Sequence, residues 1–236
     1  MEPANNTGGI TEIKKAGDES AFLHYPTFAI EKKLLEEGIS LIAGVDEVGR
    51  GALAGPLCLG IVIYQASLIA STEGPIPGIN DSKKLTPRKR KSSLELIRAT
   101  ALHASSVLVS HRTVDRLNIN GATEFALNRL IGSIPIKPDI IILDGNFSFQ
   151  APVPIRSILK GDAQSISIAS ASIVAKVRRD TIMERFDEMY PGYHFDSNKG
   201  YGTGKHLEAL AARGLSPIHR RSYEPARSMV TPEGDL

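Results

Sequence analysis

A pair of adjacent carboxylates, Asp46 and Glu47, stands at the end of a short apolar run that begins at Leu41. Neighbouring side chains of a β-strand point to opposite faces, so Asp46 can enter a site directly, whereas Glu47 at the strand's end requires the chain to curl. The tripeptide Gly49-Arg50-Gly51 follows, and its glycines allow positive φ and a close approach of the backbone to a ligand. We interpret this segment as a divalent-cation site beside a surface that grips phosphate or sugar. A strand ending in a solvated turn is the alternative.

Two further aspartates follow apolar or glycine-rich segments. Asp144 ends the run 140–143, which is typical of a buried strand, and Asp162 stands just before a long helix expected over 165–189. Because α/β sheets place ligands at the carboxyl ends of their strands, we expect Asp144 in the same crevice as Asp46. Asp162 is also typical of a helix N-cap, and the two roles are compatible. Clustered carboxylates repel unless a cation neutralises them, and oxygen-only ligands favour Mg²⁺ or Mn²⁺ over zinc. The six histidines show no close ligand spacing and are interpreted as non-ligands.

Strands that alternate with helices predict one α/β domain with a C-terminal helical portion. We expect strands over 41–46, 52–64, 104–110 and 140–144, the first two paired as a hairpin. We expect helices over 28–37, 86–100, 114–131, 165–189 and 206–213. In the second of them Thr86 is the N-cap and Pro87 the first helical residue. Residues 26–230 form the expected catalytic domain, between a flexible leader over 1–25 and a flexible tail over 231–236.

Composition limits the classes of protein that remain. Of the 236 residues 42% are hydrophobic, which predicts a folded protein, and no apolar run approaches the roughly 20 residues of a membrane helix. Cys58 is the only cysteine, which rules out an intramolecular disulfide and predicts a cytoplasmic protein. It lies in an apolar run, so we expect it in the core.

Charge is unevenly distributed along the chain. Residues 1–47 carry four Lys or Arg against nine Asp or Glu, and the rest of the chain carries 24 against 17. The densest basic stretch is Lys83, Lys84, Arg88, Lys89, Arg90 and Lys91. This stretch suits a polyanion such as nucleic acid, with a solvated helix face as the alternative.

Seven segments, in order and properly spaced, resemble the type 2 ribonuclease H family. They are GVDEVGRG (44–51), NDSKKL (80–85), LDGN (143–146), KGDA (160–163), ASIVAK (171–176), KGYGT (199–203) and HRRSY (219–223), within a match over about 28–229. The resemblance implies a ribonuclease H-like fold, with a central mixed β-sheet flanked by helices. It implies cleavage of the RNA strand in RNA/DNA hybrids, and on the 5′ side of single ribonucleotides in duplex DNA, giving 3′-hydroxyl and 5′-phosphate ends.

The same resemblance assigns roles to residues. Asp46, Glu47, Asp144 and Asp162 match the family's four carboxylates, which hold two Mg²⁺ or Mn²⁺ ions. Gly49, Arg50 and Gly51 match its ribose-recognition element, and Tyr201 matches the tyrosine that stacks on the sugar after the ribonucleotide. We expect the ring of Tyr201 to matter more than its hydroxyl.

The expected partners are RNA/DNA hybrids and duplex DNA that contains ribonucleotides. Lys83 and Lys84 are expected to hold phosphates without reading sequence. We expect a monomer without membrane attachment, acting in DNA replication and repair.

Three alternatives are weighed against this interpretation. The type 3 ribonuclease H family is expected to have Gly-Thr-Gly where this chain has Gly49-Arg50-Gly51. It also carries an N-terminal substrate-binding domain, and the residues before Leu41 are too few to form one. Another nuclease of the same fold, such as a junction resolvase, is disfavoured by the Tyr201 and Gly-Arg-Gly segments. A hybrid-binding module without catalysis is disfavoured because concentrated negative charge would oppose binding of a polyanion.

Overall fold

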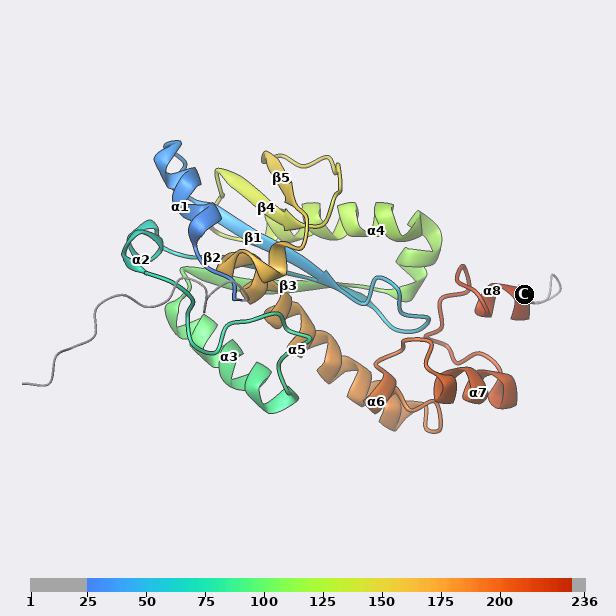
Figure 1. Cartoon of the computed structure of the whole chain (residues 1–236). Helices are drawn as coiled ribbons and strands as arrows, with labels where there is room; N and C mark the ends of the chain where they lie inside the picture. The colour runs from blue at the N-terminus through green and yellow to red at the C-terminus, as the bar shows by residue number, and fades with distance from the viewer. Residues whose placement is uncertain (1–24, 231–236) are drawn as a thin grey trace, which may run out of the picture.

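The computed structural model describes residues 25–230, and its centre is a five-stranded mixed β-sheet (Figure 1). The strand order is β3-β2-β1-β4-β5, with β1 Ile42–Val48, β2 Leu57–Ile63, β3 His103–Val109, β4 Ile140–Asp144 and β5 Ile155–Ile158. β1 pairs antiparallel with β2 and parallel with β4, so the expected hairpin is present. The two strands that carry Asp46 and Asp144 are therefore neighbours. Apart from Tyr25, the expected leader and tail lie outside the described residues.

Helices cover both faces of the sheet and gather at one end of it. In Figure 1, α4 lies on one face, α3 and α5 lie on the other, and α6 to α8 lie beyond the far end of α5. The helices are α1 Ala29–Glu36, α2 Ala66–Ser71, α3 Pro87–Thr100, α4 His111–Ser133, α5 Ile166–Met189, α6 Phe195–Asn198, α7 Gly204–Arg213 and α8 Ala226–Met229, with a 3₁₀ turn, η2, at Gly161–Ala163. The α/β class and the helical C-terminal portion are as the sequence predicts.

The predicted elements differ from the observed ones for local reasons. The strand expected from residue 52 begins only at Leu57, because Gly55 adopts a φ of 84° and Pro56 has no backbone N–H to donate. The helix expected from residue 114 begins at His111 and is broken at Asn118, which has a φ of 55°. β5 and the short helices α2, α6 and α8 were not predicted. Thr86 caps α3 as expected, since its Oγ1 accepts the backbone N–H of Lys89 at 3.3 Å.

Helix α5 packs on the sheet at two glycines. A Cβ on Gly44 would lie 2.2 Å from the carbonyl carbon of Ser167, and one on Gly60 would lie 2.1 Å from the carbonyl oxygen of Ala171. No side chain fits at either position, so the helix backbone lies directly on β1 and β2. This contact fixes the distance between β1, which carries Asp46, and α5. Cys58 is fully buried in β2, as expected.

The Gly60→Ala variant is expected to be destabilised by about 3 kcal/mol, because the added methyl meets helix backbone rather than a flexible side chain. Urea unfolding monitored by circular dichroism measures this change. Gly132→Ala in α4 is the matched control, since nothing lies within 4 Å of its added Cβ and the exposed helical site favours alanine. Equal stabilities of the two variants would contradict the close packing of α5.

Candidate active site

Asp46 lies on β1 with its carboxylate directed at α5. It is 5% exposed and accepts the backbone N–H of Glu47 at 2.8 Å. Burial raises the pKa of Asp46 well above its usual value, the charges of Glu47 and Asp144 raise it further, and the nearby Ser172 side chain of α5 lowers it. Ionised Asp46 in this position therefore requires nearby positive charge.

Glu47 is the next residue of β1, so strand alternation turns its side chain to the opposite face. The strand continues to Val48, and the curl expected at Glu47 is absent. Burial raises the pKa of Glu47 to about 7; Arg50 opposes this rise and Asp144 adds to it. Oε2 of Glu47 is buried, and no hydrogen-bond partner meets it among residues 25–230. An acidic oxygen left without a donor is suited to a cation.

Asp144 and Asp162 lie near the first two carboxylates: the charge of Asp144 acts on both Asp46 and Glu47, and that of Asp162 acts on Asp144. Asp144 ends β4, next to β1, and its Oδ1 accepts the backbone N–H of Gly161 at 2.6 Å. Burial raises the pKa of Asp144, and the charge of Asp162 also raises it. Asp162 is buried within η2, so its additional role as N-cap of α5 is wrong. Ser165 is the cap, since its Oγ accepts the N–H of Ile168 at 3.1 Å.

Lys83 belongs to this acidic group. Its Nζ lies 3.5 Å from Oδ2 of Asp162, although its side chain is 77% exposed. Burial opposes the ammonium, but the carboxylates of Asp162, Asp46 and Asp81 outweigh burial and raise the pKa of Lys83. Lys83 thus lies at the carboxylates, where it can reach a phosphate held beside them.

The donor set fits a hard divalent cation. It contains only carboxylate oxygens, with one buried oxygen unpartnered and three carboxyl groups whose pKa is raised. As the side chains stand, no group of three or more His, Cys, Asp or Glu within the described chain is arranged to hold a metal ion. Asp144, for example, is turned to the N–H of Gly161. The chemistry fits the metal, and coordination requires these side chains to draw together.

Mg²⁺ is expected to stabilise the protein more at about pH 8 than at about pH 5.5. The folded pKa of Glu47 is about 7 against an ordinary value of 4.5, so the metal-free fold loses stability as pH rises between those values. A bound cation replaces the proton that is lost, so its effect grows over the same range. The gain in unfolding midpoint should be larger by about 3 °C at the higher pH, as measured by calorimetry. Equal gains at the two pH values would contradict this expectation. So would a Glu47→Gln variant in which the gains at the two pH values still differ by the same amount.

The Gly-Arg-Gly turn follows β1 directly. Gly49 has a φ of 92°, and its backbone N–H donates to the hydroxyl of Tyr201 at 3.1 Å. A Cβ there would lie 2.1 Å from Nε of Arg179, so glycine is required for both conformation and space. Gly51 differs from Gly49: its φ is not positive, and nothing lies within 4 Å of an added Cβ. Its open surroundings leave room for a ligand.

The Arg50 side chain extends to the α4 side of the sheet. Nη1 donates to Oγ1 of Thr123 at 3.0 Å, and Nη2 donates to Oδ1 of Asn120. The guanidinium lies 4.5 Å from the ring centre of Phe147, which follows the Asp144 segment. Arg50 therefore ties the turn to α4 and to the loop after β4, and it remains partly accessible.

Tyr201 lies on a turn that packs against the loop before β2. An added Cβ on Gly200 would lie 2.3 Å from the carbonyl oxygen of Ala54, and the Arg179 guanidinium lies 5.5 Å from the Tyr201 ring centre. Tyr201 is partly buried, with its hydroxyl on Gly49. The hydroxyl joins two segments that lie 152 residues apart, so it has a structural role beside the one expected of the ring.

Comparison with known proteins decides the family. A family model described as ribonuclease HII matches residues 43–226. This chain belongs to the ribonuclease HII family. The ribonuclease H2 of Pyrococcus horikoshii OT3 has 26% sequence identity and a TM-score of 0.67, over 80% of this chain and 96% of that one.

Two more distant structures share the fold. The ribonuclease HII of Archaeoglobus fulgidus, solved in a complex with PCNA, is 24% identical with a TM-score of 0.64, over 78% of this chain and 95% of that one. Bst-RNase HIII in complex with Mn²⁺ is 19% identical with a TM-score of 0.59, over 80% of this chain and 69% of that one. The ribonuclease H-like fold is thereby confirmed.

Membership settles the broad activity. This ribonuclease HII is a metal-dependent hydrolase that acts on RNA/DNA hybrids, and the match favours type 2 over the type 3 alternative. It also leaves no support for a module that binds without catalysis. Within residues 25–230 no helix combines the length and apolar character needed to cross a membrane.

Several residues that organise this ribonuclease HII site were not predicted. Arg179 and Arg220 are fully buried and donate to backbone carbonyls around the Gly49 turn. Arg220 stands in the segment HRRSY that carried the resemblance, but no role followed from it; Arg179 gave no sequence signal. Arg90 was counted in the basic stretch, but it does not belong to a basic surface. It is buried, and its guanidinium donates to the carbonyls of Ser82 and Leu85 at 2.9 and 2.6 Å.

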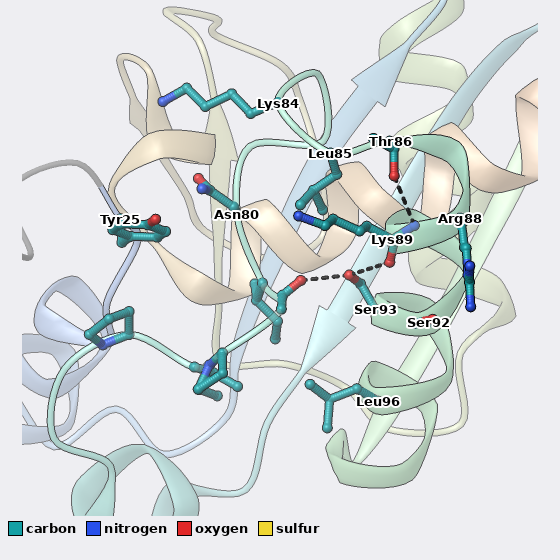
Figure 2. Close-up of a pocket in the computed structure, with 15 residues that line it drawn as sticks. Tyr25, Asn80, Lys84, Leu85, Thr86, Arg88, Lys89, Ser92, Ser93 and Leu96 are labelled. Atoms are coloured by element: carbon teal, nitrogen blue, oxygen red, sulfur yellow. Dashed lines mark hydrogen bonds between the residues drawn. The ribbon is translucent and has the colours of Figure 1, made fainter.

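A groove of about 980 Å³ lies between the loop 75–80 and α3, beside the site (Figure 2). Lys89 extends into it toward Asn80, whereas Lys84 points away from its floor (Figure 2). Lys83 and Lys84 are therefore separated by the fold: Lys83 meets the carboxylates and Lys84 stands at the edge of the groove. Their expected phosphate contacts stay predictions.

Proposed function

We propose that this ribonuclease HII cuts duplex DNA on the 5′ side of a single embedded ribonucleotide, in addition to its action on hybrids. The observation that carries the proposal is the hydrogen bond between the Gly49 N–H and the Tyr201 hydroxyl. Because of this bond, the turn that would read a 2′-hydroxyl and the ring that would stack on the next sugar form one unit. Such a unit is suited to a ribose followed by a deoxyribose, which requires reading only one 2′-hydroxyl.

Asp46, Glu47, Asp144 and Asp162 are proposed to hold two divalent cations, Mg²⁺ or Mn²⁺. The all-oxygen donor set and the unpartnered Oε2 of Glu47 support this role. A structure of the related Bst-RNase HIII contains Mn²⁺, which supports the choice of metal. Cations held by these four carboxylates would lower the pKa of a bound water and offset negative charge on the leaving 3′ oxygen. The ammonium of Lys83, 3.5 Å from Asp162, can hold the phosphate next to these carboxylates.

Gly49, Arg50 and Gly51 are proposed to recognise the ribose. The backbone of Gly51 is exposed and has no neighbour within 4 Å of its missing side chain, so a sugar can approach it. Tyr201 would meet the adjoining deoxyribose with its ring. Residues 26–230 would act as one catalytic domain of a cytoplasmic protein. The protein would be a monomer, and sedimentation equilibrium measures this oligomeric state.

The test is cleavage of an end-labelled DNA duplex that contains one ribonucleotide, with Mg²⁺, with Mn²⁺, and with a chelator. The expected result is one metal-dependent cut 5′ to the ribonucleotide, with a 3′-hydroxyl that a polymerase extends and a 5′-phosphate that a phosphatase removes. A continuous RNA/DNA hybrid is the control for active enzyme. Cleavage of the hybrid alone would contradict the proposal.

A further inference from the structure

We propose that Tyr223 and Arg220 are positioning residues that set the selectivity for a 2′-hydroxyl by fixing the peptide planes of the Gly49-Arg50-Gly51 turn. This inference rests on the proposed role of that turn in reading ribose. Neither residue faces the carboxylates; both hold the turn from behind, through its carbonyl groups.

Arg220 holds three carbonyl groups with one guanidinium. Nη2 donates to the Gly49 carbonyl at 2.6 Å, Nη1 donates to the Arg50 carbonyl at 2.8 Å, and Nε and Nη2 both donate to the Gly55 carbonyl at 3.2 Å. Arg220 is fully buried, and no carboxylate within the described chain lies at ion-pair distance from it. Burial lowers the pKa of Arg220 to about 10, so it stays charged at neutral pH and the carbonyl dipoles compensate that charge.

Tyr223 completes the hold on the turn. Its hydroxyl donates to the Arg50 carbonyl at 2.9 Å, and its ring centre lies 5.1 Å from the Arg220 guanidinium. The segment is itself anchored to α4, because Asp115 accepts the Ser222 hydroxyl at 2.6 Å and the Ser222 N–H at 3.0 Å. The Arg50 carbonyl thus receives two hydrogen bonds from a segment with a fixed position.

These hydrogen bonds fix the orientation of the peptide plane between Arg50 and Gly51. With the carbonyls of Gly49 and Arg50 engaged on the inner side, the peptide plane between Arg50 and Gly51 has its N–H on the other side. No acceptor within residues 25–230 meets the backbone N–H of Gly51. A 2′-hydroxyl oxygen can accept such an N–H, and deoxyribose offers no oxygen there. Rotation of this plane would present a carbonyl in place of the donor.

Loosening the turn should therefore weaken ribose discrimination more than hydrolysis in general. A continuous hybrid offers many ribose positions, so it tolerates a poorly fixed turn. A single ribonucleotide in DNA offers one position only. The readout is therefore kcat/KM on the single-ribonucleotide duplex divided by kcat/KM on the hybrid. A general loss of stability does not change this ratio.

The test compares Tyr223→Phe with Tyr193→Phe in the full chain. Both substitutions remove one hydroxyl that donates to a backbone carbonyl; that of Tyr193 binds the Gly214 carbonyl at 3.0 Å, away from the turn. Tyr223→Phe is expected to lower kcat/KM on the single-ribonucleotide duplex roughly tenfold and on the hybrid less than about threefold. Tyr193→Phe should leave the ratio of the two substrates unchanged.

Arg220→Lys is the second variant, because it keeps the charge but loses the fork that engages three carbonyls. It is expected to lower the ratio further than Tyr223→Phe, with folding checked by circular dichroism. An unchanged ratio in Tyr223→Phe, whatever its absolute rates, would overturn the inference while the unmodified enzyme still cuts at the ribonucleotide. An unmodified enzyme that cuts only the hybrid would instead overturn the proposed function, and this inference with it.

Discussion

Asp144→Asn is expected to lower turnover on an RNA/DNA hybrid by at least roughly a thousandfold without unfolding the protein. The asparagine Oδ1 can still accept the Gly161 N–H, which is 2.6 Å from Asp144 Oδ1. The substitution removes a carboxylate whose pKa is raised by burial and by Asp162, so the metal-free fold should be at least as stable at neutral pH. What is lost is one anionic oxygen of the cation site.

Single-turnover cleavage and thermal unfolding, both with and without Mg²⁺, measure these two effects separately. Asp139→Asn is the matched control, since Asp139 also accepts backbone N–H groups, those of Ser40 and Leu41 at 3.1 and 2.9 Å, but at the opposite end of β4. Turnover by the Asp144→Asn protein within tenfold of the unmodified enzyme would remove Asp144 from the catalytic group.

Tyr201→Ala is expected to lower cleavage at a single ribonucleotide by roughly a hundredfold and to lower cleavage of a continuous hybrid by much less. It removes both the ring, whose stacking would contribute about 1–3 kcal/mol, and the acceptor of the Gly49 N–H. Tyr201→Phe should lie between, with a loss of roughly tenfold, because the ring stays while the Gly49 N–H loses its partner.

Kinetics of both variants on both substrates separate stacking from the hydroxyl. If Tyr201→Phe matches the unmodified enzyme, the hydrogen bond to Gly49 has no role in recognition. If it is as poor as Tyr201→Ala, the ring does not stack. Equal losses of Tyr201→Ala on the two substrates would remove Tyr201 from ribonucleotide selectivity.

The strands that end in carboxylates could be predicted because their signals are local. The run 140–143 is continuously apolar, so a buried strand ending at Asp144 follows from composition alone. β5, at residues 155–158, has no comparable signal, because it is a four-residue edge strand that is only partly buried. Its parallel pairing with β4 is a tertiary effect.

Residues whose roles depend on distant partners could not be predicted from local pattern. Arg50 meets Thr123 and Phe147, and Arg90 leaves the basic stretch for the interior. A glycine pair around an arginine allows positive φ at both positions; only Gly49 adopts it, at a point where it is packed against Arg179. Asp162 had the spacing of a helix cap, and the intervening 3₁₀ turn moved that role to Ser165.

Recognition of a single ribose is tested most directly with DNA duplexes that are identical except for the sugar at one position. That sugar is ribose, deoxyribose or 2′-O-methylribose, and the measurement is the rate and position of cutting with Mg²⁺ or Mn²⁺. One cut is expected, on the 5′ side of the ribose, and none in the other two duplexes, because the turn at Gly49 to Gly51 is proposed to recognise a free 2′-hydroxyl. Cutting of the deoxyribose duplex at a comparable rate, or an uncut ribose duplex under conditions in which a continuous hybrid is degraded, would contradict it.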